Sequence, residues 1–196
     1  MAELRIQTLQ AAAIADGLDP LAALRIAVFR EWPYLYEGSS EYEKKYLDTY
    51  LRSARSLAIL VWDGEHCIGA STALPLIEAE PAAQRPFLEQ GQALAQIDYF
   101  GESIILRSYR GRGLGVKFFE LREAHAREHG LKHCAFCAVE RPVDHPARPA
   151  DYVPNDAFWT RRGYRKQTAL QASYDWPDIG QTQSSAKAMS FWMKTL

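Results

Sequence analysis

The sequence lacks most of the features that mark secreted, membrane-spanning or nucleic-acid-binding proteins. It has only three cysteines among 196 residues, an odd number that offers no disulfide framework. No apolar run approaches the roughly 18 residues that a membrane span needs, and the N-terminus does not open like a signal peptide. The formal net charge of -1 gives no general attraction to nucleic acid or to an anionic membrane. We therefore expect a cytoplasmic protein with no nucleic-acid and no membrane partner.

Two of the cysteines, Cys134 and Cys137, form a C-x-x-C pattern inside an apolar run that ends at Val139. If this run is a strand, its period of two sends the two thiols to opposite faces of the sheet. Chelation of a metal or formation of a redox pair would then be awkward. The pattern predicts buried structural thiols and no metal site.

The chain is long enough for a substantial hydrophobic core, and 47% of its residues are hydrophobic while 24% are charged. No internal repeat or linker divides it, so we expect a single domain over residues 1–196. The expected strands are Leu4–Leu9, Ser56–Trp62, Cys67–Leu74, Ile97–Leu106, Lys132–Val139, Tyr164–Tyr174 and Ala186–Thr195. The expected helices are Asp19–Phe29, Glu41–Ser53, a short exposed helix within 78–92, one from the glycine-rich turn to His129, and Asn155–Arg162.

Helix and hairpin boundaries follow from capping and turn residues. Asp19 before Pro20 is predicted to cap the first helix, and Ser39 or Ser40 the second. Asp63-Gly64 indicates a hairpin turn between the second and third strands.

A glycine-rich turn follows the strand that ends near Leu106 and precedes an apolar helix. Unpaired N–H groups and the helix dipole make such a helix N-terminus an anion site, best suited to a phosphate or pyrophosphate. The turn lacks the Gly-Lys-Ser/Thr of a Walker loop, and Val116 replaces the third glycine of a dinucleotide fingerprint. The remaining pattern is Arg-x-x-Gly-x-Gly, formed by Arg110, Gly113 and Gly115.

With this turn the sequence resembles the GNAT superfamily of N-acetyltransferases, whose acetyl-CoA loop has this form. The segment from Asn155 to Tyr164 is similar to the fourth-helix segment of the family, and the element order agrees along nearly the whole chain. The resemblance implies an α/β (α+β) GNAT acyl-CoA N-acyltransferase fold, with a mixed, mostly antiparallel sheet flanked by about four helices. It implies transfer of an acetyl or other acyl group from acetyl-CoA to an amine of a small molecule or peptide, by direct attack in a ternary complex.

The resemblance also implies which residues hold coenzyme A. Backbone amides from Arg110 to Gly115 would bind the pyrophosphate, and the edge of the strand through Ser103–Arg107 would pair with the pantetheine arm. A backbone N–H near Ile104 or Ile105 would polarise the thioester carbonyl. The implied cofactor-binding residues are Ile104, Ile105, Leu106, Arg107, Arg110, Gly111, Arg112, Gly113, Leu114, Gly115, Asn155 and Trp159. Capping remains the alternative for Asn155, and core packing remains the alternative for Trp159.

Two residues are candidates for proton transfer. Glu102, on the strand before the loop, is the first choice for the general base, with Asp98 and Tyr99 as alternatives and a purely structural role equally open. Trp159 stands where many family members carry a tyrosine that protonates the leaving thiolate, and an indole cannot do this. Tyr152 in the adjoining loop is the candidate for that role.

Acceptor binding is expected from the loop after the first helix and from the loop that follows the strand ending at Val139. The candidates are Tyr34, Tyr36, Glu37, Arg141 and His145. Both charge signs are present, so cationic amines, amino acids and peptide N-termini all remain open. The final strand, Ala188–Thr195, is a candidate for pairing with a second subunit in a homodimer.

Two other functional classes remain as alternatives. His125, Glu128 and His129 match the H-x-x-E-H of inverted-zincin metallopeptidases, although the helix already follows the phosphate loop and no third ligand stands out. The missing tyrosine also leaves open a non-catalytic acyl-CoA-binding or sensory module on the same fold.

Overall fold

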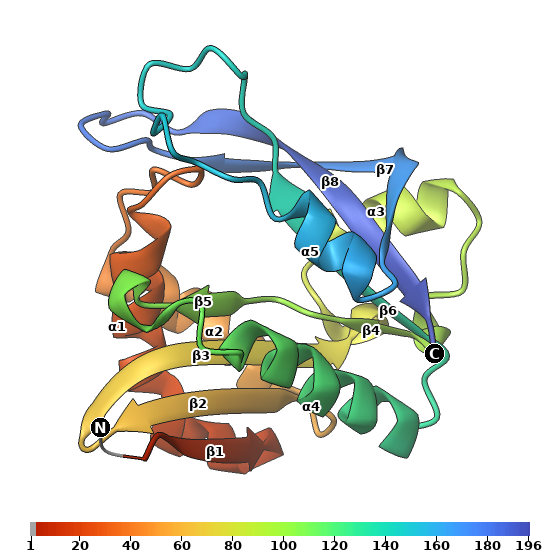
Figure 1. Cartoon of the computed structure of the whole chain (residues 1–196). Helices are drawn as coiled ribbons and strands as arrows, with labels where there is room; N and C mark the ends of the chain where they lie inside the picture. The colour runs from red at the N-terminus through yellow and green to blue at the C-terminus, as the bar shows by residue number, and fades with distance from the viewer. Residues whose placement is uncertain (1–2) are drawn as a thin grey trace.

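The computed structural model describes residues 3–196, which form eight strands and five α-helices (Figure 1). The strands are β1 (Arg5–Gln10), β2 (Leu57–Asp63), β3 (His66–Pro75), β4 (Ile97–Tyr99), β5 (Ser103–Ile105), β6 (His133–Val139), β7 (Arg165–Trp176) and β8 (Ser185–Thr195). The helices are α1 (Leu18–Phe29), α2 (Ser40–Arg52), α3 (Pro81–Glu89), α4 (Leu114–Glu128) and α5 (Asp156–Arg161). In this part of the chain, no helix combines the length and apolarity that crossing a membrane requires.

The strands form one mixed sheet in the order β1-β2-β3-β4-β6-β8-β7, with β5 paired to β3 outside this path. All pairs are antiparallel except β4 with β6. In Figure 1 the half built on β1, β2, β3 and β5 diverges from the half built on β6, β7 and β8. The predicted mixed, mostly antiparallel fold is confirmed, with five helices instead of about four.

The strand expected from Ile97 to Leu106 is instead two short strands that belong to different halves of the sheet. β4 pairs with β6, and Phe100 N still donates to Ala135 O at 2.8 Å. Gly101 N then donates to Thr72 O at 3.3 Å, and β5 pairs only with β3. A side chain at Gly101 would collide with the Tyr50 and Thr72 hydroxyls, so only glycine fits where the chain crosses. The sheet therefore splits at this residue.

Helix starts follow the capping residues in one case and not in another. Ser39 caps α2, because its hydroxyl accepts from Tyr42 N at 3.3 Å, as predicted. Asp19 does not cap α1: a 3-10 turn over Ala11–Gly17 leads into a helix that begins at Leu18, so Asp19 lies within its first turn. The predicted cap was therefore wrong.

Two expectations about surfaces also need correction. The helix α3 is not simply exposed, because Phe87 is buried and its ring lies edge-on to Phe191 with centroids 4.9 Å apart.

The strand β8 lies between β6 and β7, so both of its edges are hydrogen-bonded within the chain. It cannot supply the edge for a second subunit that Ala188–Thr195 was expected to offer.

The two cysteines lie on opposite faces of β6 as predicted, but only Cys134 is buried and Cys137 is partly exposed. Cys134 is buried in the core cluster that contains Phe118 and Phe119 of α4. Cys137 faces the other side, where its Sγ lies 3.2 Å from the hydroxyl of Tyr99. Both thiols are free, and the strand period separates them.

Candidate active site

The glycine-rich turn presents a row of backbone amides without protein partners. Gly111 and Gly113 have φ values of 77° and 82°, a conformation that side chains disfavour. Within residues 3–196, none of the amides from Gly111 to Val116 donates to a protein acceptor. Six such groups stand at the start of the 15-residue helix α4, so the turn has the donors and the dipole of an anion site.

The arginine side chains of this turn fold back onto the protein. Arg110 Nη2 lies 2.8 Å from Glu31 Oε2, and its Nε donates to Ile105 O at 3.0 Å. Arg112 donates to Ser108 O at 3.1 Å. Arg107 is exposed, with its Nη2 3.7 Å from Asp151. The amides are therefore the donors left open to an anion, while the guanidinium groups fix the turn and add positive charge around it.

β5 pairs with β3 only, so its other edge has no strand partner. Leu106 N donates to Ile68 O and Thr72 N donates to Glu102 O, so even-numbered residues of this segment bond to β3. By the alternation of an antiparallel pair, the N–H groups of Ser103 and Ile105 point away from β3. Of the two candidates for polarising a carbonyl, Ile105 faces the opening and Ile104 faces β3.

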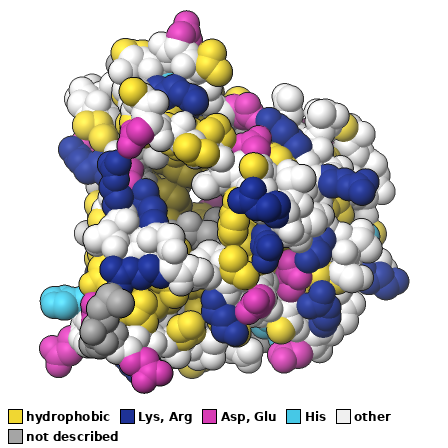
Figure 2. Space-filling model, in the orientation of Figure 1, with side chains coloured by type: hydrophobic (Ala, Val, Ile, Leu, Met, Phe, Trp, Pro, Cys, Tyr) yellow, Lys and Arg dark blue, Asp and Glu magenta, His cyan; other side chains and the backbone are white. Residues whose placement is uncertain are grey.

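A cleft of about 490 Å³ opens where the two halves of the sheet part. In Figure 2 it appears as a hollow with a hydrophobic floor and with lysine and arginine side chains on its rims. Six of the predicted site residues line it: Tyr34, Glu102, Arg141, Tyr152, Asn155 and Trp159. The amide row, the free strand edge and this cleft together fit an extended ligand with an anionic end, as coenzyme A is.

The residues from α5 contribute to the cleft in different ways. Trp159 packs edge-on between Phe136 and Trp192, with ring centroids 5.1 Å away in each case, and also faces the cleft. Trp159 therefore packs in the core, and its contact with the cofactor stays a prediction. Asn155 stands at the N-cap position of α5, but its side chain makes no capping hydrogen bond. Its amide is available to a ligand in the cleft.

The loop between β6 and α5 brings an aromatic cluster to the rim of the cleft. The Trp32 ring lies 5.0 Å from the His145 ring and 5.9 Å from the Tyr152 ring. Tyr152 lines the cleft, whereas His145 only supports Trp32 from behind. Burial raises the pKa of Tyr152, so its hydroxyl stays protonated at neutral pH.

Arg141 ties the rim together instead of reaching into the site. Its guanidinium donates to both carboxylate oxygens of Asp178, at 2.7 and 3.0 Å, and to the carbonyls of Pro33 and Tyr34, at 2.9 and 2.7 Å. Four of its five donors are therefore used by the protein. Its side chain is 7% exposed and fixes the loop that carries Tyr34.

Glu102 is held in a buried network at the point where the sheet splits. It is 2% exposed, and its carboxylate is bonded to Arg25 and to the hydroxyl of Thr72. Tyr50 also donates to it, at 3.3 Å. Arg25 binds Glu43 as well, so one cation serves two buried carboxylates and the cluster keeps a negative charge. Burial alone would lower the pKa of Arg25, but the negative charges around it raise it well above its ordinary value.

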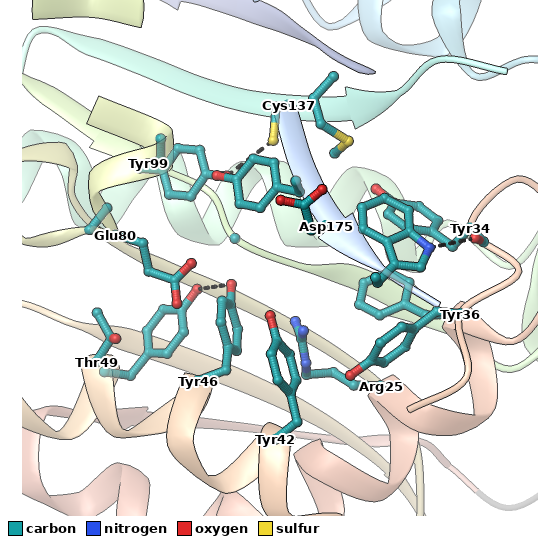
Figure 3. Close-up of a pocket in the computed structure, with 18 of the residues that line it drawn as sticks. Arg25, Tyr34, Tyr36, Tyr42, Tyr46, Thr49, Glu80, Tyr99, Cys137 and Asp175 are labelled. Atoms are coloured by element: carbon teal, nitrogen blue, oxygen red, sulfur yellow. Dashed lines mark hydrogen bonds between the residues drawn. The ribbon is translucent and has the colours of Figure 1, made fainter. Parts of the chain in front are cut away.

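A second, smaller pocket of about 100 Å³ lies on the other side of the split, between α1, α2 and the strands β7 and β8. Tyrosine is the commonest residue in its walls (Figure 3). The aromatic residues that line it are Phe29, Tyr34, Tyr36, Tyr42, Tyr46, Tyr50, Tyr99, Tyr174 and Trp176. Of the predicted acceptor residues, Tyr34 and Tyr36 are therefore in place.

Glu37 is not in either cavity. It forms an ion pair with Arg30 on the surface, where both side chains are well exposed. The sequence prediction for Glu37 was therefore wrong, because the chain turns its side chain outward.

Sequence reasoning missed most of the residues that build this pocket. Tyr42, Tyr46 and Tyr50 recur at four-residue spacing, which puts them on one face of α2, and this pattern was a usable signal. Arg25 inside an apolar helical run was another. Tyr174 and Trp176 gave no signal, because only the pairing of β7 with β8 brings them to this place.

The remaining candidates lie elsewhere. Asp98 is fully buried and its Oδ2 lies 3.4 Å from His125 Nδ1, so it faces α4 and neither cavity. Burial raises its pKa. His129 stacks on His125 with ring centroids 4.3 Å apart. Among residues 3–196, no cluster of three metal-binding side chains is found around this pair.

Comparison with protein families gives one match. Residues 22–150 match the family described as Acetyltransferase (GNAT) family. This range contains most of α1, the split strands, the glycine-rich turn and α4. No curated protein sequence matches the chain.

Solved structures share the fold at low sequence identity. An N-acetyltransferase from Staphylococcus aureus Mu50 has a TM-score of 0.61 at 10% identity, with 99% of each chain covered. An acetyltransferase from Thermus thermophilus has a TM-score of 0.59 at 17% identity, with 100% of each chain covered. The PaiA N-acetyltransferase from Thermoplasma acidophilum, solved in complex with coenzyme A, has a TM-score of 0.56 at 13% identity, with 99% of each chain covered.

Proposed function

The chain belongs to the GNAT acetyltransferase family and is an N-acetyltransferase that uses acetyl-CoA. From this premise we propose that a small amine attacks the carbonyl carbon of the acetyl thioester directly, while both substrates are bound. The amine would occupy the tyrosine-lined pocket, and the cofactor would occupy the cleft on the other side of the split sheet. No covalent intermediate on the protein is needed, because proximity alone supplies a large part of the rate enhancement, on the order of 7–11 kcal/mol.

One observation carries this proposal: the cleft and the tyrosine-lined pocket share part of their walls. Phe29, Tyr34, Gly101 and Cys137 line both. The two cavities therefore meet where β4 and β5 separate. Groups bound on the two sides can therefore approach one another along these shared walls.

Acetyl-CoA supplies an activated acetyl thioester when it is bound. In our proposal the amides of Gly111 to Val116 hold its pyrophosphate, and the free edge of β5 holds the pantetheine arm. The outward N–H of Ile105 lies on this edge and is the group that would stabilise negative charge on the thioester oxygen. Trp159 and Asn155 line the same cleft.

Proton removal from the amine is assigned to Glu102, acting through Tyr50. Tyr50 lines the tyrosine-lined pocket and donates to Glu102, so it can take a proton from the amine while passing its own proton on. Tyr46, whose hydroxyl lies 3.4 Å from that of Tyr50, extends this path along the wall. Tyr152, on the cleft side, is proposed to protonate the departing thiolate.

Initial-rate kinetics test the proposal. Thiol release from acetyl-CoA is measured over a grid of acetyl-CoA and amine concentrations, for each member of a panel of small amines. Direct attack in a ternary complex predicts intersecting double-reciprocal lines. Parallel lines, together with an acetylated protein detected by mass spectrometry in the absence of amine, would show a covalent intermediate and contradict it.

A further inference from the structure

The tyrosine-lined pocket contains two carboxylates that the protein leaves without partners. Glu80 and Asp175 both line it, and within residues 3–196 neither carboxylate has a hydrogen bond or an ion pair. Glu80 stands at the N-cap position of α3 yet does not cap the helix. Burial raises the pKa of Glu80, although the nearby Arg25 opposes this, so a bound cation would relieve an unfavourable buried charge.

The positive charge in the pocket is already compensated. Arg25 is the only lysine or arginine among the described residues that line this pocket, and it is bonded to Glu43 and Glu102. The local balance is therefore negative. An acceptor with a carboxylate would meet two uncompensated negative charges and no free positive one.

The aromatic walls favour a cation in the same way. Burial raises the pKa values of Tyr34, Tyr36 and Tyr46, so these phenols stay neutral and present uncharged ring faces and hydroxyls. Neutral aromatic faces attract ammonium groups and also pack against methylene chains. Figure 3 shows these side chains around one space, together with Glu80 and Asp175.

The two ends of the pocket differ. Gly101 and Cys137, shared with the cleft, mark the end where the reacting amine must lie. Asp175 is exposed and Glu80 is partly exposed, so the carboxylates belong to the side that opens to solvent. We propose, on the basis of the proposed function, that the acceptor is a small diamine-like compound: a primary amine joined by an apolar linker to a second positive charge, which Glu80 and Asp175 bind.

Three probes with five carbon atoms each test this inference: 1,5-diaminopentane, pentylamine and 5-aminopentanoate. Their far ends are positive, neutral and negative, respectively. Their affinity for the protein saturated with coenzyme A is measured by calorimetry, which does not depend on turnover. We expect 1,5-diaminopentane to bind about tenfold more tightly than pentylamine, and 5-aminopentanoate to bind most weakly.

Variants locate the source of the preference. Glu80→Gln and Asp175→Asn should each reduce the advantage of the diamine over pentylamine severalfold and leave pentylamine binding unchanged. Glu37→Gln is the matched control, because this nearby carboxylate lies outside the pocket, and it should leave the preference intact.

Equal affinity for the diamine and pentylamine, or no detectable binding of the diamine, would overturn the inference. Acetyl transfer is measured separately with the same probes. A diamine that binds preferentially but is never acetylated would count against the proposed function and not against this inference. Acetylation of pentylamine as efficient as that of the diamine, with equal binding, would preserve the function and remove the assigned substrate class.

Discussion

At the scale of single residues, the site depends on a charged cluster that the protein buries. Arg25 lies between Glu43 and Glu102, and the two carboxylates are almost completely inaccessible. Separating such a cluster is costly, since a buried charge without a partner loses its solvation. The two carboxylates are nevertheless not equivalent, because only Glu102 is bonded to Tyr50, which lines the tyrosine-lined pocket.

This difference makes Glu102→Gln and Glu43→Gln a matched pair. Each substitution removes one negative charge from the same cluster and leaves Arg25 with one carboxylate. If Glu102 is the base, Glu102→Gln lowers kcat/KM roughly 10²-fold and abolishes the fall in activity on the acidic side of the pH profile. Glu43→Gln retains that acidic limb. Identical profiles for the two variants would make Glu102 a structural residue.

The contact between Arg141 and Asp178 gives a prediction about stability. Burial would raise the pKa of Asp178, but the hydrogen bonds and charge of Arg141, with Lys187, lower it overall. A lowered pKa in the folded state means that the stabilisation is complete above the unfolded value of about 3.9 and is lost as the pH falls through the folded value. Asp178→Asn should therefore reduce the free energy of unfolding by about 2 kcal/mol at pH 7.

Urea unfolding at several pH values checks this. The difference between wild type and Asp178→Asn should shrink below about pH 4 and disappear at lower pH. A difference that stays constant down to about pH 2 would show that the pair does not stabilise the fold through its charge.

At the scale of elements, the glycine-rich turn and the divided strand place the cofactor site. Gly113 is the N-cap of α4 with a left-handed backbone, and its carbonyl accepts from Lys117 N at 3.1 Å. An alanine at this position is strained by about 1 kcal/mol, although no atom would obstruct its side chain. The strain would turn the free amides of the turn away from a bound pyrophosphate.

Gly113→Ala should accordingly weaken the binding of coenzyme A about tenfold, the loss of roughly one charge-assisted hydrogen bond. Gly64→Ala is the control. Gly64 has a φ of 59° in the β2–β3 hairpin and also leaves space for a side chain. The two variants should lose similar thermal stability, but Gly64→Ala should bind coenzyme A like the wild type. Equal weakening in both would mean that the turn has no special part in binding.

Local signals predicted most elements correctly, and tertiary contacts explain the failures. Ser39 and Asp63-Gly64 act within a few residues, and the structure has the cap and the hairpin that they predicted. The division of the Ile97–Leu106 strand depends instead on partners far along the chain, Thr72 and Ala135, and no local pattern records them. The glycine-rich turn is one continuous stretch of sequence, so its pattern could be recognised. Glu80, Asp175 and Trp176 could not be recognised in this way, because the pocket is assembled from α1, α2, α3 and β7.

At the scale of the whole molecule, two cavities lie on either side of the split in the sheet and share the walls formed by Phe29, Tyr34, Gly101 and Cys137. The larger cavity has lysine and arginine among its lining residues, and the smaller one has aromatic walls with a negative balance. A polyanionic cofactor in the cleft and a cationic acceptor in the tyrosine-lined pocket would then be separated by charge until they meet at the shared walls. The central claim is that the turn before α4 grips the pyrophosphate of the cofactor.

Calorimetric titration of the purified protein with coenzyme A and with pantetheine tests this claim most directly. Pantetheine has the thiol arm but lacks the pyrophosphate and the nucleotide. We predict that coenzyme A binds with one-to-one stoichiometry and that pantetheine binds at least about a hundredfold more weakly, since several charge-assisted hydrogen bonds are missing. Equal affinities, or no binding of coenzyme A, would contradict the account.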